Sequence, residues 1–140
     1  MTPVITLTET ADAKATAVIE EGLSSYNRAQ AGYFDVRGLN ALVSDPETHD
    51  VLGGILGRTS LGLCFLDLVF LPEHLRGLDV GTRMMTEAEE EARRRGCRAV
   101  ALYTISFQAP GFYEKRGYRE FGRIACDPPG TSRIFMVKDL

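Results

Sequence analysis

Hydrophobic and polar positions recur with two different periods along the chain, and these periods predict its strands and helices. Residues 4–8 alternate over a short stretch, which predicts a strand, whereas the apolar residues of 11–26 recur at helical spacing. Residues 36–44 and 51–59 have strand character and flank a turn-rich segment, so they predict a hairpin. The nearly continuous apolar run 63–71 predicts a third consecutive strand.

The second half of the chain continues this alternation. The apolar residues of 81–95 recur at helical spacing. A solvated outer face is predicted by acid-before-base pairs four residues apart, namely Glu89/Arg93, Glu90/Arg94 and Glu91/Arg95. Residues 97–105 predict a strand and 108–116 a short helix, and a final hairpin is predicted from 118–126 and 133–138. The order β-α-β-β-β-α-β-α-β-β predicts an α/β fold with a mixed central sheet and helices on both faces.

The length and composition of the chain argue against several classes of function. A chain of 140 residues suits a single domain spanning residues 1–140. The net charge of −3, with acidic and basic residues interspersed, argues against nucleic-acid binding through a basic face. No signal-like N-terminus and no apolar stretch of about eighteen residues is present, so a cytoplasmic protein without membrane association is expected. The three cysteines, Cys64, Cys97 and Cys126, lack ligand spacing, so structural thiols and no metal site are expected.

A glycine-containing turn, residues 75–83, joins the third consecutive strand to the helix that follows it. Amides at a helix N-terminus have no intrahelical acceptor and the helix dipole is positive there, so a phosphate or pyrophosphate is well matched to this turn. A Walker A loop is excluded because Val80-Gly81-Thr82 supplies no lysine. A dinucleotide fingerprint is disfavoured because the turn has only two glycines, Gly77 and Gly81.

Two segments of the chain resemble the signatures of one enzyme family. Residues 76–81, R-G-L-D-V-G, are similar to a Q/R-x-x-G-x-G/A turn, and residues 109–118, which contain Y-E-K-R-G-Y, are similar to a helix carrying Y-E-K-x-G-F/Y. Both signatures, in this order, occur in the GNAT superfamily of acyl-CoA-dependent N-acetyltransferases. The resemblance implies acetyl-CoA as co-substrate. It also implies a GNAT-like fold, in which two parallel strands splay apart to admit the pantetheine arm.

Asp79 departs from this pattern, because the family usually has glycine at its position. Glycine lets the backbone approach a pyrophosphate closely, whereas aspartate adds a side chain and, when ionised, a negative charge beside the phosphates. Aspartate nevertheless visits left-handed conformations and caps helix N-termini, so its carboxylate is expected to turn back onto the first-turn amides. Cofactor binding is therefore expected to be retained but weakened.

The resemblance also implies one catalytic acid and a set of cofactor-binding residues. Tyr113 falls where the family commonly places a tyrosine that protonates the departing thiolate, although packing within the short helix also accounts for an aromatic there. The positions implied to bind the cofactor are the backbone of Val69, Phe70 and Leu71, the amides of Arg76, Gly77, Leu78, Asp79, Val80, Gly81, Thr82 and Arg83, and the side chains of Gln108 and Lys115. Gln108 and Lys115 are equally explained as a helix-start residue and a surface charge.

The general base is less clearly defined. Asp67 is the only ionisable residue between Leu61 and Leu71. Strand alternation places it on the same face as Leu63, Phe65, Val69 and Leu71. A carboxylate isolated in an apolar strand needs a charged partner or binds protons more readily, and the second case would suit a base near neutral pH. An ion-paired or edge-exposed aspartate is the alternative. Glu73 at the strand end is a weaker candidate.

These features predict an N-acetyltransferase that moves the acetyl group of acetyl-CoA to a primary amine of a small molecule or peptide by direct attack. One alternative is a non-catalytic acyl-CoA-binding module, favoured by Asp79. Another is a protein-modifying enzyme, including one that acts on aminoacyl-tRNA, which the acidic balance disfavours. Residues 27–35 predict a loop or short helix, and Tyr26, Tyr33 and Phe34 are candidates for an acceptor wall or for satellite core. A homodimer fits the resemblance, because dimers are frequent in the family.

Overall fold

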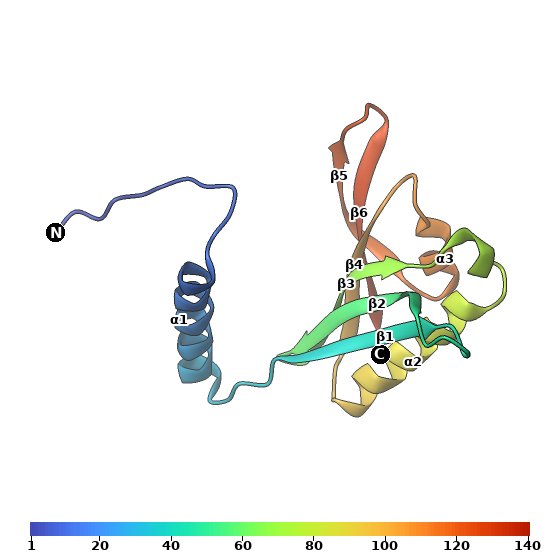
Figure 1. Ribbon diagram of the computed structural model, residues 1–140, viewed down its shortest axis with the longest axis horizontal. Coiled ribbons are helices and arrows are strands. Elements are labelled where there is room, and N and C mark those ends of the chain that lie inside the picture. Colours follow the sequence, from blue (N-terminus) through green and yellow to red (C-terminus); the bar gives the residue numbers. More distant parts are fainter. The chain divides into compact units, whose positions relative to one another are not determined.

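The computed structural model describes all 140 residues as two units, residues 1–34 and residues 35–140. The first unit contains one helix, α1 (Ala13–Ala31), which follows a segment without regular structure (Figure 1). The Asp12 carboxylate accepts a hydrogen bond from a first-turn amide and so caps the N-terminus of α1. Gly32 ends the helix with a left-handed backbone, φ 89°, which glycine adopts without steric cost.

Two expectations for the first unit are corrected by the structure. Residues 4–8 form no strand, because alternation of side chains defines two faces but supplies no neighbouring strand for the backbone hydrogen bonds. The helix also continues through residues 27–31, which the sequence pattern predicts as a loop or short helix. The alanines and glutamine of this segment favour a helix, and Arg28 lies near the negative end of the helix dipole.

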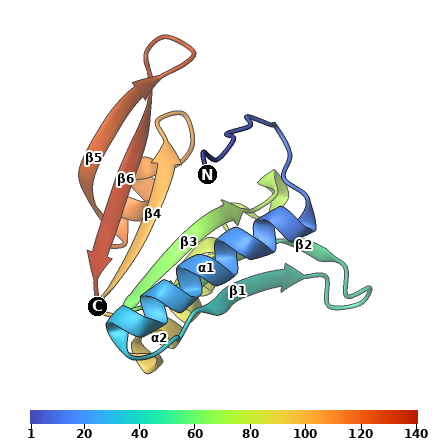
Figure 2. The ribbon, with the colours of Figure 1, turned by 90° about the vertical axis from the view of Figure 1, so that its left-hand side faces the viewer.

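The second unit is built on a six-stranded sheet with the order β1-β2-β3-β4-β6-β5 (Figures 1 and 2). Its strands are β1 (Arg37–Ser44), β2 (Val51–Ser60), β3 (Leu63–Phe70), β4 (Ala99–Ile105), β5 (Arg119–Cys126) and β6 (Thr131–Asp139). Only β3 and β4 pair in parallel, and all other neighbouring strands are antiparallel. The predicted mixed sheet and both predicted hairpins are therefore confirmed.

The parallel strands β3 and β4 separate after a short paired stretch. They pair from Leu63 opposite Ala99 to Leu66 opposite Leu102, and their remaining residues do not pair with each other. Figure 2 shows the two strands diverging beyond this point. The separation leaves the second half of β3 without a strand partner on its β4 side, so the backbone groups of that edge are free to bind something else.

One extra residue interrupts β3 close to the point of separation. In the pairing with β2, Leu66 lies opposite Gly57 and Leu68 lies opposite Leu56, so Asp67 has no opposite residue. This arrangement is a β-bulge, which adds one residue to one strand and reverses the direction of every side chain that follows.

The bulge corrects the predicted orientation of Asp67. Asp67 shares the exposed side of β3 with Leu63 and Phe65, but Val69 and Leu71 pack against the core on the opposite side. Strict alternation fails here because it assumes one residue per position along the whole strand. Asp67 is therefore separated from the apolar core and lies on the side of the sheet that carries exposed residues.

Two helices of the second unit, α2 (Val80–Arg94) and α3 (Pro110–Lys115), pack against one face of the sheet, on the same side in Figure 1. A 3₁₀ turn, η1 (Glu73–Leu75), precedes α2. The core between sheet and helices contains Leu39, Ile55, Cys64, Leu66, Met84, Met85, Ala88, Ala92, Cys97, Val100, Leu102, Tyr113, Tyr118, Ile134 and Met136. Within residues 35–140, α2 and α3 cover the same face of the sheet.

Glu89 is a buried acidic residue of α2 that holds several elements together. Its carboxylate accepts hydrogen bonds from Tyr118 Oη at 2.8 Å, Lys138 Nζ at 2.8 Å and Arg116 Nη2 at 3.3 Å. Only 3% of Glu89 is exposed, and the two cations balance its charge where water is largely excluded. Burial, together with the Glu89 charge, raises the pKa of Tyr118, so its hydroxyl remains a hydrogen-bond donor.

Replacing Glu89 by alanine is expected to lower the free energy of unfolding by about 3–5 kcal/mol, because it leaves two partly buried cations without their counter-charge. Glu89→Gln should cost less, since the amide oxygen still accepts hydrogen bonds. Urea denaturation followed by circular dichroism measures both variants. Glu90→Ala, at the exposed neighbouring position of α2, is the control and should unfold like the parent protein. Equal midpoints for Glu89→Ala and Glu90→Ala would show that the cluster does not stabilise the fold.

Candidate active site

A cavity of about 630 Å³ opens where β3 and β4 separate. It is bounded by the end of β3, the turn before α2, the first turn of α2, the end of β4 and the segment leading into α3. Its lining residues are Val69, Phe70, Leu71, Arg76, Gly77, Asp79, Gly81, Thr82, Met84, Thr104, Phe107, Gln108, Ala109, Phe112 and Tyr113. Segments that are far apart in the sequence therefore meet around one hollow.

Most of the residues that the sequence singles out line this cavity, and five do not. Leu78, Val80, Arg83 and Lys115 belong to the same turn and helices but lie outside the lining, and Asp67 lines a different cavity. Leu78, for example, is 62% exposed and points away from the cavity. The weaker candidate Glu73 is exposed on η1 and lines neither cavity.

The turn before α2 forms part of the cavity wall and contains backbone amides without an intrahelical acceptor. The amide of Arg83 donates to the Asp79 carbonyl at 2.9 Å, so the amides of residues 80–82 precede the first hydrogen bond of the helix. Gly77 and Asp79 both have left-handed backbones, with φ of 79° and 61°. Arg76 Nε donates to the Leu71 carbonyl at 3.1 Å and ties the turn to the end of β3. This turn is suited to an anion, because free amides and the positive end of the helix dipole coincide.

The structure confirms the backbone conformation expected for Asp79 but not its expected capping role. Its φ of 61° confirms that the aspartate occupies the left-handed region, where glycine is the usual residue. Its carboxylate makes no capping hydrogen bond to the first turn of α2, so the expected cap is absent. The reason is geometric, because N-cap side chains reach the first-turn amides from an extended backbone rather than from a left-handed one. The negative charge therefore remains on the cavity wall.

Gly81 at the start of α2 makes a close contact with α3. A Cβ atom at this position would lie 3.3 Å from Phe112 Cζ and 3.5 Å from Leu71 Cδ1. The absence of a side chain lets the Phe112 ring pack against the first turn of α2, next to the amides that face the cavity. Phe112 was not predicted as a lining residue although it lies within the second signature, because an aromatic there is equally explained by packing.

Tyr113 is buried on α3, with 7% of its surface exposed, and its ring packs edge-on against Phe112 and Tyr118. Burial raises the pKa of Tyr113, because an apolar environment disfavours the phenolate. The phenol is therefore protonated at neutral pH and is available as a proton donor.

A second cavity, of about 150 Å³, lies beside the first. Its lining residues are Leu66, Asp67, Leu68, Val69, Tyr103, Thr104, Ile105, Gln108, Tyr113 and Arg133. Four residues line both cavities, namely Val69, Thr104, Gln108 and Tyr113. The two hollows therefore adjoin at Tyr113, and a group in one can approach a group in the other there.

Asp67 in the small cavity is ion-paired. Arg58 Nη1 donates to its two carboxylate oxygens at 2.6 and 2.8 Å, and the guanidinium lies over the Phe65 ring, 4.8 Å from the ring centroid. About half of the Asp67 side chain is exposed. The sequence left open an isolated and a paired carboxylate, and the structure shows the paired one.

Gln108 has a structural role as well as a place on both cavity walls. Its Oε1 accepts from the Ile105 amide at 3.0 Å and from Thr104 Oγ1 at 3.2 Å, which closes the turn after β4. It lies before α3, which begins at Pro110, so it does not open that helix. Thr104 was not singled out from the sequence, because a buried threonine in a strand is an ordinary core residue.

Comparison with known proteins assigns the fold and site to a class of enzyme. The acetyltransferase (GNAT) family profile matches residues 10–118. An acetyltransferase of Agrobacterium fabrum is 34% identical over 94% of this chain and 96% of its own length. Blasticidin-S acetyltransferase of Streptomyces morookaense is 36% identical over 67% of this chain and 70% of its own.

A solved structure gives the same result. The crystal structure of an acetyltransferase from Agrobacterium tumefaciens superposes with a TM-score of 0.90, at 33% identity, over 99% of this chain and all of that chain. The chain belongs to the acetyltransferase (GNAT) family. It is an acyltransferase that uses acetyl-CoA, as the sequence resemblance implies. None of its helices has the length and apolar character needed to cross a membrane.

Proposed function

We propose that the protein transfers the acetyl group of acetyl-CoA to a primary amine of a small molecule or peptide, and that residues 1–140 act as one catalytic domain. The observation that carries this proposal is the meeting of two cavities at Tyr113. The large cavity has the anion-binding turn on its wall, and the small one has a carboxylate. Such an arrangement lets a thioester and an amine approach from opposite sides of the gap between β3 and β4.

The large cavity is assigned to acetyl-CoA. The amides of the turn that spans residues 76–83 would bind the pyrophosphate, because they precede the hydrogen-bonded part of α2. The unpaired β4-side edge of residues 69–71 would receive the amide groups of the pantetheine arm. Gln108 retains its side-chain NH₂ for a contact with the cofactor. Lys115 is exposed outside the cavity and would act only on an outer phosphate.

The proposed reaction has the thioester in the large cavity and the amine in the small one, with Tyr113 between them. The nitrogen of the neutral amine attacks the thioester carbonyl carbon, the carbon–sulfur bond breaks, and the thiolate takes the phenolic proton of Tyr113. The proton lost by the amine passes through water to the Asp67 carboxylate. Asp67 then releases this proton to solvent, and solvent returns a proton to Tyr113. No covalent bond to the enzyme forms, and no metal takes part.

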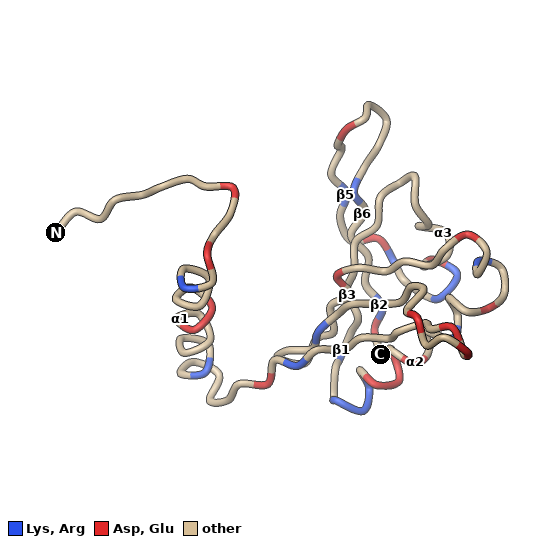
Figure 3. The backbone as a smooth tube through the Cα atoms, in the orientation of Figure 1, with Lys and Arg blue, Asp and Glu red and all other residues tan.

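The relatives and the charge distribution support a small-molecule acceptor over nucleic acid. A relative that is 36% identical to this chain is named for blasticidin S, which supports a small-molecule acceptor. Figure 3 shows acidic and basic positions interspersed along the strands and helices rather than gathered on one element, which disfavours a tRNA-bearing acceptor. The cytoplasmic location and the homodimer expected from the sequence stay predictions.

Asp79→Gly is expected to tighten acetyl-CoA binding by about three- to tenfold, because it removes a negative charge beside the pyrophosphate and suits the left-handed backbone. Isothermal titration calorimetry with acetyl-CoA and with free CoA measures the change. Asp79→Asn separates the two contributions, since it removes the charge and keeps the side chain. Weaker binding by Asp79→Gly would mean that the carboxylate assists binding.

Tyr113→Phe is expected to lower kcat by about a hundredfold or more, because the ring remains and the proton donor is lost. The binding of acetyl-CoA should change little. Thiol release over a panel of primary amines measures turnover. Since burial raises the pKa of Tyr113, activity should be lost at alkaline pH only above the ordinary tyrosine pKa of about 10.

Tyr118→Phe is the matched control for this variant, because it also removes one buried tyrosine hydroxyl. It should lower stability through the lost hydrogen bond to Glu89 and leave kcat largely intact. Unchanged turnover in Tyr113→Phe would refute the role of Tyr113 as the acid.

Asp67→Asn is expected to lower kcat/KM and to remove the acidic limb of the pH–rate profile, because the amide cannot accept the proton of the amine. Arg58→Gln is the companion variant, since it removes the ion pair and keeps the Asp67 carboxylate, so the acidic limb should persist in it. An acidic limb that also persists in Asp67→Asn would assign the base to another group or to water alone.

A further inference from the structure

Arg133 is the one cationic side chain among the residues that line the small cavity. It lies on β6, opposite Ile105 of β4 and opposite Ile124 of β5. Its guanidinium has no acidic partner within ion-pairing distance. Asp67, the one acidic lining residue, is bound by Arg58 instead. In the small cavity, the charge of Asp67 is therefore balanced by Arg58, whereas the charge of Arg133 is not balanced by any acidic residue.

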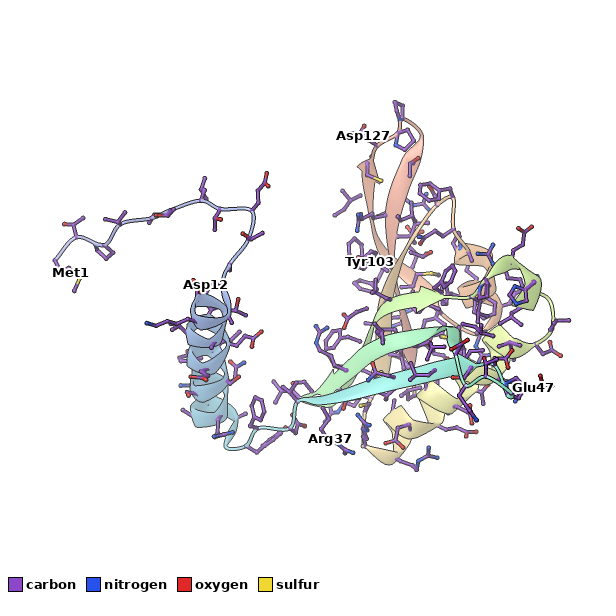
Figure 4. All side chains as sticks on the ribbon, in the orientation of Figure 1. Met1, Asp12, Arg37, Glu47, Tyr103 and Asp127 are labelled. Atoms are coloured by element: carbon purple, nitrogen blue, oxygen red, sulfur yellow. The ribbon has the colours of Figure 1, made fainter.

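Arg133 stacks on an aromatic ring. Its guanidinium carbon lies 5.1 Å from the centroid of the Tyr103 ring, and Tyr103 packs in turn against Phe135 at 5.9 Å. Figure 4 shows Tyr103 on the side of the sheet away from α2 and α3. A stacked guanidinium keeps its N–H donors in the plane of the group, where they form a rigid fork that matches a carboxylate. The Arg133 guanidinium is thus stacked on an aromatic ring and has no acidic partner in the protein.

We infer that the acceptor of the proposed acetyl transfer carries a carboxylate close to its amine, and that Arg133 binds this carboxylate. This inference rests on the proposed function. Arg133 and Tyr113 line the same small cavity, so an acceptor held by Arg133 has its amine near the proposed acid. A cavity of about 150 Å³ is also below the usual range for drug-sized ligands, which suits a small amino carboxylate.

The acidic balance of the whole chain does not oppose this assignment. The net charge of −3 acts over the molecule, whereas the contact with the acceptor is decided by the groups that line the cavity. There, the Arg58–Asp67 pair is nearly neutral as a unit and Arg133 adds one positive charge. A zwitterionic acceptor places its anion at Arg133 and its amine toward Asp67 and Tyr113.

The test compares acceptors that differ only in the carboxylate. Free amino acids, their carboxamides and simple alkyl amines are offered with acetyl-CoA, and thiol release gives kcat/KM for each. The parent protein should prefer one or more free amino acids to the matching carboxamides by about ten- to hundredfold. R133Q should abolish most of this preference, mainly through KM, and R133K should retain part of it because the charge remains and the fork is lost.

R123Q is the matched control, since Arg123 is an exposed arginine of neighbouring β5 that pairs with Glu120 and lines neither cavity. It should keep the parent's preference. Turnover of amines without preference for the carboxylate, or an equal loss on acids and carboxamides in R133Q, would overturn the inference and leave the proposed acetyl transfer standing. Thiol release with none of the amines, despite calorimetric binding of acetyl-CoA, would overturn both.

Discussion

The separation of β3 from β4 is the constraint on which the rest of the structure depends. A continuous parallel pair would satisfy the backbone groups of both strands along their whole length and would close the sheet. Because pairing ends at Leu66 and Leu102, the following residues of β3 keep β2 as a neighbour on one side only. Both cavities lie along this opening, and the turn proposed to bind the pyrophosphate follows the end of β3. The position of the site is thus determined by the point at which hydrogen bonding between β3 and β4 ends.

The bulge at Asp67 determines which side chains reach each side of that opening. Before the bulge, the exposed face of β3 carries Leu63 and Phe65; after it, Val69 and Leu71 turn to the core. The extra residue therefore places a carboxylate on the side of the small cavity while the next apolar residues remain available to the large one. Without the bulge, uninterrupted alternation would place Val69 and Leu71 on the same face as Asp67.

Local sequence patterns predicted much of this molecule, and the failures have a common cause. The six strands of the sheet, α2, α3 and the turn at Gly77 were predictable, because hydrophobic period and turn residues act within a few positions. The same patterns gave a strand at residues 4–8, where the partner is missing, and placed Val69 and Leu71 on the same face as Asp67, although one extra residue breaks the period between them. Pairing partners and register shifts depend on distant residues, so they leave no local signal.

The same limit explains which site residues were found. The turn proposed to bind the cofactor and the proposed acid Tyr113 were found from the sequence because each lies within a contiguous motif. Thr104 and Arg133 were not, because a buried threonine and an exposed arginine in strands look like ordinary core and surface positions. Glu89 shows the converse error, since its spacing to Arg93 indicated a solvated pair, yet its carboxylate faces Tyr118, Lys138 and Arg116.

This buried acid also accounts for the stability of the short helix that carries Tyr113. A helix of six residues is too short to form alone, since isolated helices below about 12–15 residues are marginal in water. At one end of α3, Phe112 packs on Gly81, and just past the other end Arg116 reaches Glu89 and Thr86 on α2. Both contacts are made to the helix whose first turn faces the large cavity. The proposed acid and the amides proposed to bind the pyrophosphate are therefore both held by α2. Their spacing is set by packing and by a buried charge cluster, and not by the loops between them.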